Sequence, residues 1–304
     1  MDIFVAYIAP VLVGIGIGIL SGMLGIGGGT VMVPIFRLAF DMSAIMSTAT
    51  SLFTIIPTSI SGAVSHIRAK TCIVSLGVAA GIGGACTSPL GVWLATISPP
   101  WLIMAAAAII IGYSAISMLR KALKMKPAKV PAVSDEAEAV QGHAARLRAS
   151  EDVGAAHPHD AGAAEAVQGQ AAGAVDGKLT RKQLLIGAGI GLGAGLASGY
   201  VGVGGGFIMV PLMLSLIGIS MKKASGTSLI AVMILAIPGV IEQGILGNIN
   251  YTAGIMVAIG SIPGAVIGAR LVRKVPERIL RFIFGGFLIV AAIMLVLNET
   301  GVIA

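Results

Sequence analysis

The sequence predicts an all-α polytopic membrane protein made of two inverted repeats of five segments each. Three observations support this fold class: most residues are apolar, a glycine motif recurs 177 positions further along the chain, and the basic residues gather on one predicted side of the membrane. The apolar composition indicates that the protein is surrounded by lipid, and the recurring motif indicates an internal duplication. The distribution of basic residues indicates the direction in which each half is inserted.

The composition excludes several classes of protein. Of the 304 residues, 56% are hydrophobic and only 11% are charged, whereas a soluble protein carries roughly a quarter charged residues. The net charge of +7 comes from residues placed between apolar runs, so no nucleic acid is expected as a partner. The expected partner is the lipid bilayer. Because no apolar stretch holds a cluster of His, Asp and Glu, we expect neither an enzyme nor a metal or other cofactor.

Ten apolar stretches follow one another along the chain. Most are long enough for a helix to cross the hydrocarbon core, which takes about 20 residues: 3–24, 44–64, 72–97, 101–119, 184–200, 227–246, 251–269 and 279–297. The other two, 30–40 and 207–219, are too short for a full crossing. The sequence leaves open whether this short pair crosses the membrane or turns back as re-entrant hairpins.

Residues 127–180 separate a first transmembrane repeat, 1–126, from a second, inverted repeat, 181–304. The separating segment is rich in Ala, Gly, Pro and scattered charges and has few large apolar residues. Such a composition cannot bury a core, so we expect a disordered linker. His157 and His159 lie in it and are interpreted as solvated residues, since no second ligand cluster accompanies them.

The two halves match at a constant offset. SGMLGIGGG at 21–29 recurs as SGYVGVGGG at 198–206, and Val33-Pro34 recurs as Val210-Pro211. Five segments per half is an odd number, so the second copy must enter the membrane from the opposite side. Alternating sides along the ten stretches then puts every Lys and Arg except Arg37 on one side. By the positive-inside rule that side is cytoplasmic, with the linker, and both termini face outward.

The glycines fall into two groups with different predicted roles. Gly14, Gly18 and Gly22, like Gly191, Gly195 and Gly199, recur every four residues, which lines one helix face with small residues and favours close helix packing. A nucleotide-binding loop is not expected, because no Lys-Ser/Thr follows the GIGGG motif.

The triple glycines interrupt apolar sequence just before each short segment. Backbone N–H groups freed there cannot face lipid, so they must line protein or a wet cavity, and at a helix N-terminus they favour an anion. We expect the two loops to meet near the midplane and to hold an anion; the alternative is that the glycines only form tight turns. The predicted anion-binding residues are Gly27, Gly28, Gly29, Thr30, Gly204, Gly205, Gly206 and Phe207.

Four hydroxyls near predicted helix starts are further candidates for the anion site: Thr50, Ser51, Thr227 and Ser228. They could equally bond carbonyls of their own helices. Glu242, the one carboxylate well inside a predicted stretch, is a candidate for proton coupling, against the simpler interpretation of an interfacial residue. His66, beside Arg68, is expected to be solvated.

With its paired G-x-x-G-x-G-G-G signatures, 22–29 and 199–206, each followed by Val-Pro, the chain resembles the TauE/SafE, or sulfite exporter, family. The resemblance covers both halves but not the linker. It implies a transporter, expected to be an exporter, of small sulfur-containing anions such as sulfite or organosulfonates in the bacterial inner membrane. Since Cys72 and Cys86 both lie in stretch 72–97, we expect no thiol relay.

The expected mechanism is a carrier whose two repeats rock around a central site. Two other classes stay open: an anion channel, and a membrane-embedded enzyme or assembly factor. The sequence also leaves open whether the protein forms a homo-oligomer.

Overall fold

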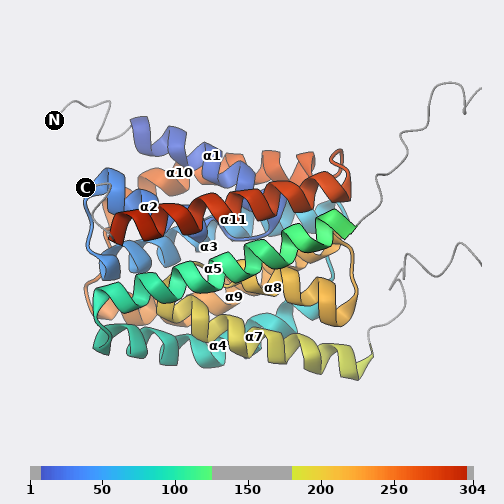
Figure 1. Ribbon diagram of the computed structural model, residues 1–304, viewed down its shortest axis with the longest axis horizontal. Coiled ribbons are helices and arrows are strands. Elements are labelled where there is room, and N and C mark those ends of the chain that lie inside the picture. The colour runs from blue at the N-terminus through green and yellow to red at the C-terminus, as the bar shows by residue number, and fades with distance from the viewer. Residues whose placement is uncertain (1–7, 125–179, 300–304) are drawn as a thin grey trace, which may run out of the picture.

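A computed structural model describes residues 8–124 and 180–299, and all regular structure in these ranges is helical (Figure 1). Six of the helices are long and apolar enough to cross a membrane, which confirms the predicted all-α polytopic class. The predicted linker lies outside the described residues except for Thr180. The elements are α1 (Ala9–Leu24), α2 (Gly29–Phe40), α3 (Ala44–Arg68), α4 (Val74–Ile97), α5 (Pro100–Lys124), α7 (Arg181–Val201), α8 (Gly206–Leu212), the π-helix η2 (Met213–Ile217), α9 (Met221–Ile245), α10 (Tyr251–Leu271) and α11 (Glu277–Glu299).

Each short segment is the second arm of a hairpin. In Figure 1, α1 runs from the left edge into the bundle, the chain turns between Leu24 and Gly29, and α2 returns to the left edge. From the right edge, α7 enters and α8 with η2 returns. The structure therefore shows the re-entrant form that the sequence left open.

The chain ends of the described halves lie at opposite ends of the bundle. The start of α1 and the end of α11 lie on the left in Figure 1, whereas the end of α5 and the start of α7 lie on the right. Arg37, the exception in the charge count, lies in the last turn of α2, at the left-hand end. This arrangement is compatible with the predicted sidedness; which membrane face each end occupies stays a prediction.

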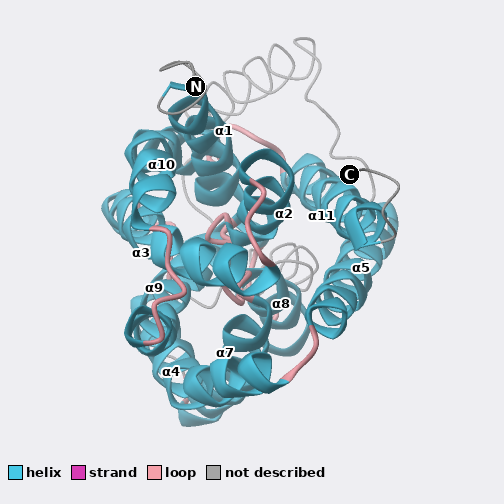
Figure 2. Cartoon of the chain, turned by 90° about the vertical axis from the view of Figure 1, so that its left-hand side faces the viewer, coloured by secondary structure: helices cyan, strands magenta, loops and turns pink. Residues whose placement is uncertain are grey.

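Most helix packing joins the first half of the chain to the second. The helix pairs in closest contact are α1 with α10 and α4 with α7, while α3 packs on α9 and α5 on α11. Viewed down the bundle in Figure 2, the α5–α11 pair forms one side, and the α1–α10 and α4–α7 pairs lie at opposite ends of the other. The pairing is reciprocal, as two equivalent halves would give, but the inverted repeat itself stays a prediction.

The four-residue glycine spacing forms the two tightest contacts, as predicted. A Cβ added to Gly14, Gly18 or Gly22 would lie within 3.0 Å of the α10 backbone, and one added to Gly195 or Gly199 within 3.0 Å of the α4 backbone. Real Cβ atoms essentially never come this close to a neighbour, so only glycine allows these helix axes to approach so far.

The starts of α9 and α4 differ from the predicted ones. Helix α9 begins at Met221 rather than at residue 227, because Ser220 caps it by accepting a hydrogen bond from the Lys223 N–H at 3.4 Å. Helix α4 begins at Val74, so the prediction that both cysteines share one helix was wrong for Cys72, which precedes it. Both cysteines are free thiols.

Candidate functional site

The two glycine loops have the same backbone conformation. Gly25 and Gly202 end α1 and α7 in the left-handed region, with φ of 77° and 73°, and donate their N–H groups to Ser21 O and Ser198 O. Gly28 and Gly205 then begin the returning helices, again at positive φ. Because residues with a Cβ rarely adopt this conformation, glycine is needed at these positions for the chain to reverse inside the bundle.

The two loops contact each other through their backbones. A Cβ on Gly29 would lie 2.5 Å from Val203 O, and one on Gly206 would lie 2.5 Å from Gly25 O. All residues of both loops, 25–30 and 202–207, are buried. The predicted meeting of the loops is therefore present, and in the described conformation they pack closely and are closed to both ends of the bundle.

Several polar groups around the first loop have no hydrogen-bond partner. The hydroxyls of Ser21, Thr30 and Ser59 are fully buried and unpaired. Ser59 Oγ lies 3.4 Å from the position that a Cβ on Gly27 would take, and Ser21 Cβ lies 3.5 Å from the corresponding point on Gly28. Buried hydroxyls are normally bonded, so these three are candidates to donate to a partner from outside the chain.

The backbone at the start of α2 adds further donors. Val31 and Met32 both donate to Gly28 O, whereas Gly29 and Thr30 precede the helical ladder and, among the described residues, their N–H groups form no backbone hydrogen bond. The free amides and the helix dipole favour negative charge at this position. The unpaired hydroxyls and amides are thus buried donors on the first loop or on the helices beside it.

The second loop is poorer in hydroxyls. Ser198, the counterpart of Ser21, is buried and unpaired, but Phe207, a fully buried ring, stands where the first loop has Thr30. Ala236 likewise stands at the position equivalent to Ser59. The donors therefore concentrate on the first loop, an asymmetry that the repeat pattern alone did not predict.

The four candidate hydroxyls on α3 and α9 have different roles in the structure. Thr50 Oγ1 accepts from Asn250 N at 3.0 Å, and Thr227 Oγ1 accepts from Ile73 N at 2.9 Å. Both bonds join the two halves of the chain. Thr50 and Thr227 are each the seventh residue of their helix, in the second turn of α3 and α9.

Ser51 and Ser228, which follow Thr50 and Thr227 in the chain, differ in their hydrogen bonds. Ser228 Oγ donates to Gly25 O at 2.7 Å and so holds the first loop, whereas Ser51 Oγ is buried without a partner. Of the four hydroxyls, only Ser51 is left unpaired within the described part of the chain.

Glu242 lies away from the loops. It is in the last turn of α9, half-buried, and its Oε2 has no partner. Leu235, which lies against Gly205, is seven residues earlier on the same helix, or about 10 Å along its axis. A coupling role for Glu242 stays a prediction, and it would act from the end of the helix rather than from the loops.

His66 is a polar residue that the sequence analysis misplaced. It was expected in solvent but is fully buried, because α3 continues to Arg68 and turns His66 inward. Its Nε2 lies 2.8 Å from Gly22 O and its Nδ1 2.8 Å from Thr71 Oγ1. The spacing of Ser59, Gly62 and His66, three and four residues apart, was the available signal for a buried face.

No group of three or more His, Cys, Asp and Glu residues that could hold a metal occurs among the described residues. His157 and His159, the histidines of the predicted linker, lie outside them.

Comparison with known proteins gives matches along nearly the whole chain. The family model "Sulfite exporter TauE/SafE" matches residues 11–295. The probable membrane transporter protein YunE of Bacillus subtilis is 24% identical over 280 residues, which is 90% of this chain and 91% of YunE. YdhB of the same organism, also a probable membrane transporter protein, is 26% identical over 266 residues, 87% of this chain and 90% of YdhB.

A partial match comes from a larger protein. The probable membrane transporter protein MamO of Magnetospirillum gryphiswaldense is 36% identical over 112 residues, 34% of this chain and 18% of MamO. No solved structure is significantly similar to the chain.

Proposed function

The chain belongs to the sulfite exporter TauE/SafE family, and from this membership we propose that it is a secondary transporter that exports small sulfur-containing anions such as sulfite or organosulfonates. It is a multi-pass membrane transporter by family and by its apolar helices. The substrate class and the outward direction follow the family's name.

The observation that carries this proposal is the presence of buried, unpaired donors on the first glycine loop and on the helices beside it. Ser21, Thr30 and Ser59 each offer a hydroxyl with no partner among the described residues, and the Gly29 and Thr30 amides add donors at the start of α2. An oxyanion bound there would exchange its water for hydrogen bonds without a buried lysine or arginine.

The closed packing of the loops supports a carrier. Gly29 and Gly206 press against backbone of the opposite loop, so the loops must separate before an anion can reach the donors. In a carrier, the separated loops expose the site to one side of the membrane at a time. A substrate that binds between the loops favours the conformation through which the carrier passes from one side to the other.

The proposal is tested by a binding screen on the purified protein. Isothermal titration calorimetry with sulfite, thiosulfate, sulfoacetate, taurine, sulfate and small carboxylates should find saturable binding of a sulfur oxyanion. Reconstituted vesicles should then show counterflow of the same solute. Large unitary currents instead would indicate a channel, and no flux of any of these solutes would contradict transport of this class.

Ser59→Ala separates an anion-binding role from a structural one. The change removes no hydrogen bond within the protein, so the melting temperature should stay the same or rise. A lost hydrogen bond to a charged ligand should weaken anion binding by about 10- to 100-fold.

Ser98→Ala is the matched control, since the Ser98 hydroxyl donates only to Leu94 O, at the end of α4. It should leave anion affinity unchanged. Equal affinities of the Ser59→Ala and wild-type proteins would place the anion elsewhere.

A further inference from the structure

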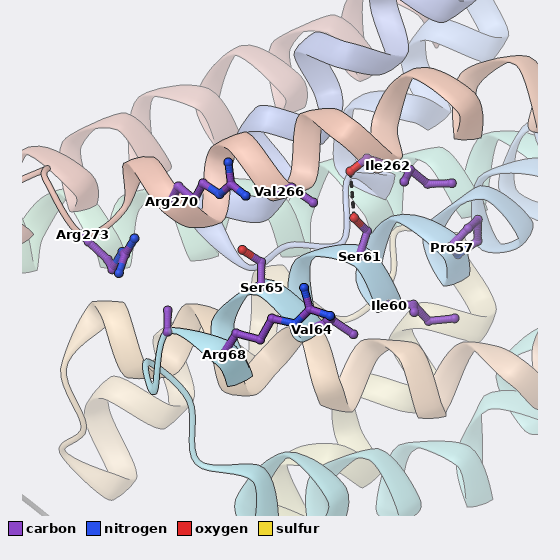
Figure 3. A pocket seen from close by; sticks show the side chains of 11 residues that line it. Pro57, Ile60, Ser61, Val64, Ser65, Arg68, Ile262, Val266, Arg270 and Arg273 are labelled. Atoms are coloured by element: carbon purple, nitrogen blue, oxygen red, sulfur yellow. Dashed lines mark hydrogen bonds between the residues drawn. The ribbon is translucent and has the colours of Figure 1, made fainter.

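A cavity of about 560 Å³ lies between α3 and α10, away from the glycine loops (Figure 3). Its walls come from opposite halves of the chain. We call it the arginine pocket. Arg68, Arg270 and Arg273 line it near the ends of α3 and α10, and Ile60, Val64 and Ile262 line its apolar walls further along these helices, with Val64 beside the Arg68 side chain in Figure 3.

The basic end carries three positive charges that are not neutralised. Arg68 is the last residue of α3, Arg270 lies in the last turn of α10, and Arg273 follows that helix. No acidic residue lines the pocket. Within the described ranges, none of the three guanidinium groups forms an ion pair or hydrogen bond; Arg273 takes part only through its carbonyl, which accepts from Lys222 Nζ.

A free hydroxyl lies beside these charges. Figure 3 shows Ser61 and Ser65 on the α3 wall, with Ser61 bonded across the pocket to Ile262 O at 2.8 Å. Ser65 Oγ, nearer the arginines, has no hydrogen bond among the described residues. The basic end thus offers guanidinium and hydroxyl donors together, the combination that binds a phosphate.

The remaining walls of the pocket are apolar and face outward. Ile60, Val64 and Ile262 are 43%, 41% and 41% exposed, and on a membrane-spanning helix exposed aliphatic side chains meet lipid chains. From Pro57 to Arg68 the α3 wall comprises twelve residues, a rise of about 16 Å. The pocket therefore extends from the helix ends well into the depth of the hydrocarbon.

We propose that the arginine pocket binds one anionic phospholipid, with its phosphate at the three arginines and an acyl chain along the Ile60–Val64–Ile262 wall. A small soluble anion would use only the basic end, and a neutral lipid would leave the three charges without a counter-ion. An anionic lipid matches both the charges and the apolar walls. The occupant would bridge α3 of the first half and α10 of the second.

The experiment compares lipids added to the purified full-length protein in detergent. Dioleoyl phosphatidylglycerol should raise the melting temperature saturably and appear as a bound adduct in native mass spectrometry. Dioleoyl phosphatidylcholine, inorganic phosphate and glycerol 3-phosphate should do neither. If inorganic phosphate reproduces or competes away the effect, the site takes a soluble anion and the lipid proposal is overturned.

Substitutions test whether phosphatidylglycerol binds at the arginine pocket. Replacing the three pocket arginines by Gln should weaken phosphatidylglycerol binding by about a hundredfold, taking about tenfold or less for each lost charge near the headgroups. The control removes three exposed charges from the same end of the bundle, Arg120→Gln, Arg181→Gln and Lys182→Gln, and should bind as the wild type does. Equal losses in both triples would mean only general attraction to negative lipid.

A further variant keeps every charge. Val64→Trp fills the space along the apolar wall of the pocket and should also abolish the melting-temperature shift that phosphatidylglycerol causes. Because Val64 is 41% exposed, the larger side chain can be accommodated without disturbing the core, and a normal gel-filtration profile would verify folding. Retained lipid binding in this variant would overturn the proposed position of the acyl chain.

Discussion

Replacing Gly18 by Ala tests whether the α1–α10 contact depends on bare backbone. A Cβ on Gly18 would lie 2.8 Å from Ser261 Cα and 2.9 Å from Ala265 N, and ordinary contact begins at 3.4 Å. These atoms must therefore retreat by 0.6 and 0.5 Å, and Ser261 O by more. Because both partners are backbone, no side chain can rotate away, and the two helices must move apart.

The structure contains its own control for this substitution. Gly16, two residues earlier on α1, has nothing within 4 Å of the position where its Cβ would lie. Overpacking at Gly18→Ala should cost about 1–3 kcal/mol, whereas Gly16→Ala should gain about 0.5–1 kcal/mol from the better helix former. The two variants should therefore differ by roughly 1.5–4 kcal/mol, which is about 2–6 °C in melting temperature for a chain of this size.

The assay is thermal unfolding of both variants purified in the same detergent. The second half allows an independent repetition, since Gly195 meets the α4 backbone as Gly18 meets that of α10, and Gly193 is as open as Gly16. If the Gly18→Ala and Gly16→Ala variants have the same melting temperature, the close approach of α1 and α10 does not stabilise the bundle.

Three further predictions concern other parts of the chain. His66→Ala should lower the melting temperature, with a cost of about 2–5 kcal/mol, because it removes a buried ring that bonds Gly22 O and Thr71 Oγ1; His66→Gln should recover part of the loss, and a neutral result would contradict the structural role. Glu242→Gln should leave anion affinity intact but abolish the pH dependence of uptake in vesicles if this carboxyl carries the coupling proton, and an unchanged pH profile would remove it from the mechanism. Deleting residues 132–174 should leave counterflow intact, and a dead deletion would show that the linker does more than connect the halves.

The fold could be read from the sequence because its main signals are local or periodic. Hydropathy located the helices, and the recurrence of the motif at Gly22–Gly29 and Gly199–Gly206 located the two loops. The start of α9 was missed because Lys222 and Lys223 interrupt the apolar run, although Ser220 at the cap was a visible signal. The sequence left open whether the short segments cross the membrane or turn back, and only the structure shows that they form hairpins.

The hydrogen bonds of the site could not be read from the sequence. Thr50 bonds Asn250, and Thr227 bonds Ile73, across separations of 200 and 154 residues. Ser51 and Ser228 hold equivalent positions in the repeat, yet only Ser228 finds a carbonyl. A repeat predicts equivalent positions, but the partners depend on how the two halves pack.

The reciprocal pairing of α1 with α10 and α4 with α7 has a consequence for biogenesis. When the ribosome has finished the first half, α1 and α4 already expose their close-packing faces, but the helices that cover them have not been made. The first half therefore stays incompletely packed in the bilayer until the second half is inserted and its helices pack against α1 and α4. Because each closely packed helix pair takes one member from each half, we expect helix pairs, rather than the two sequence halves, to be the moving bodies, in contrast to the expectation from the sequence alone.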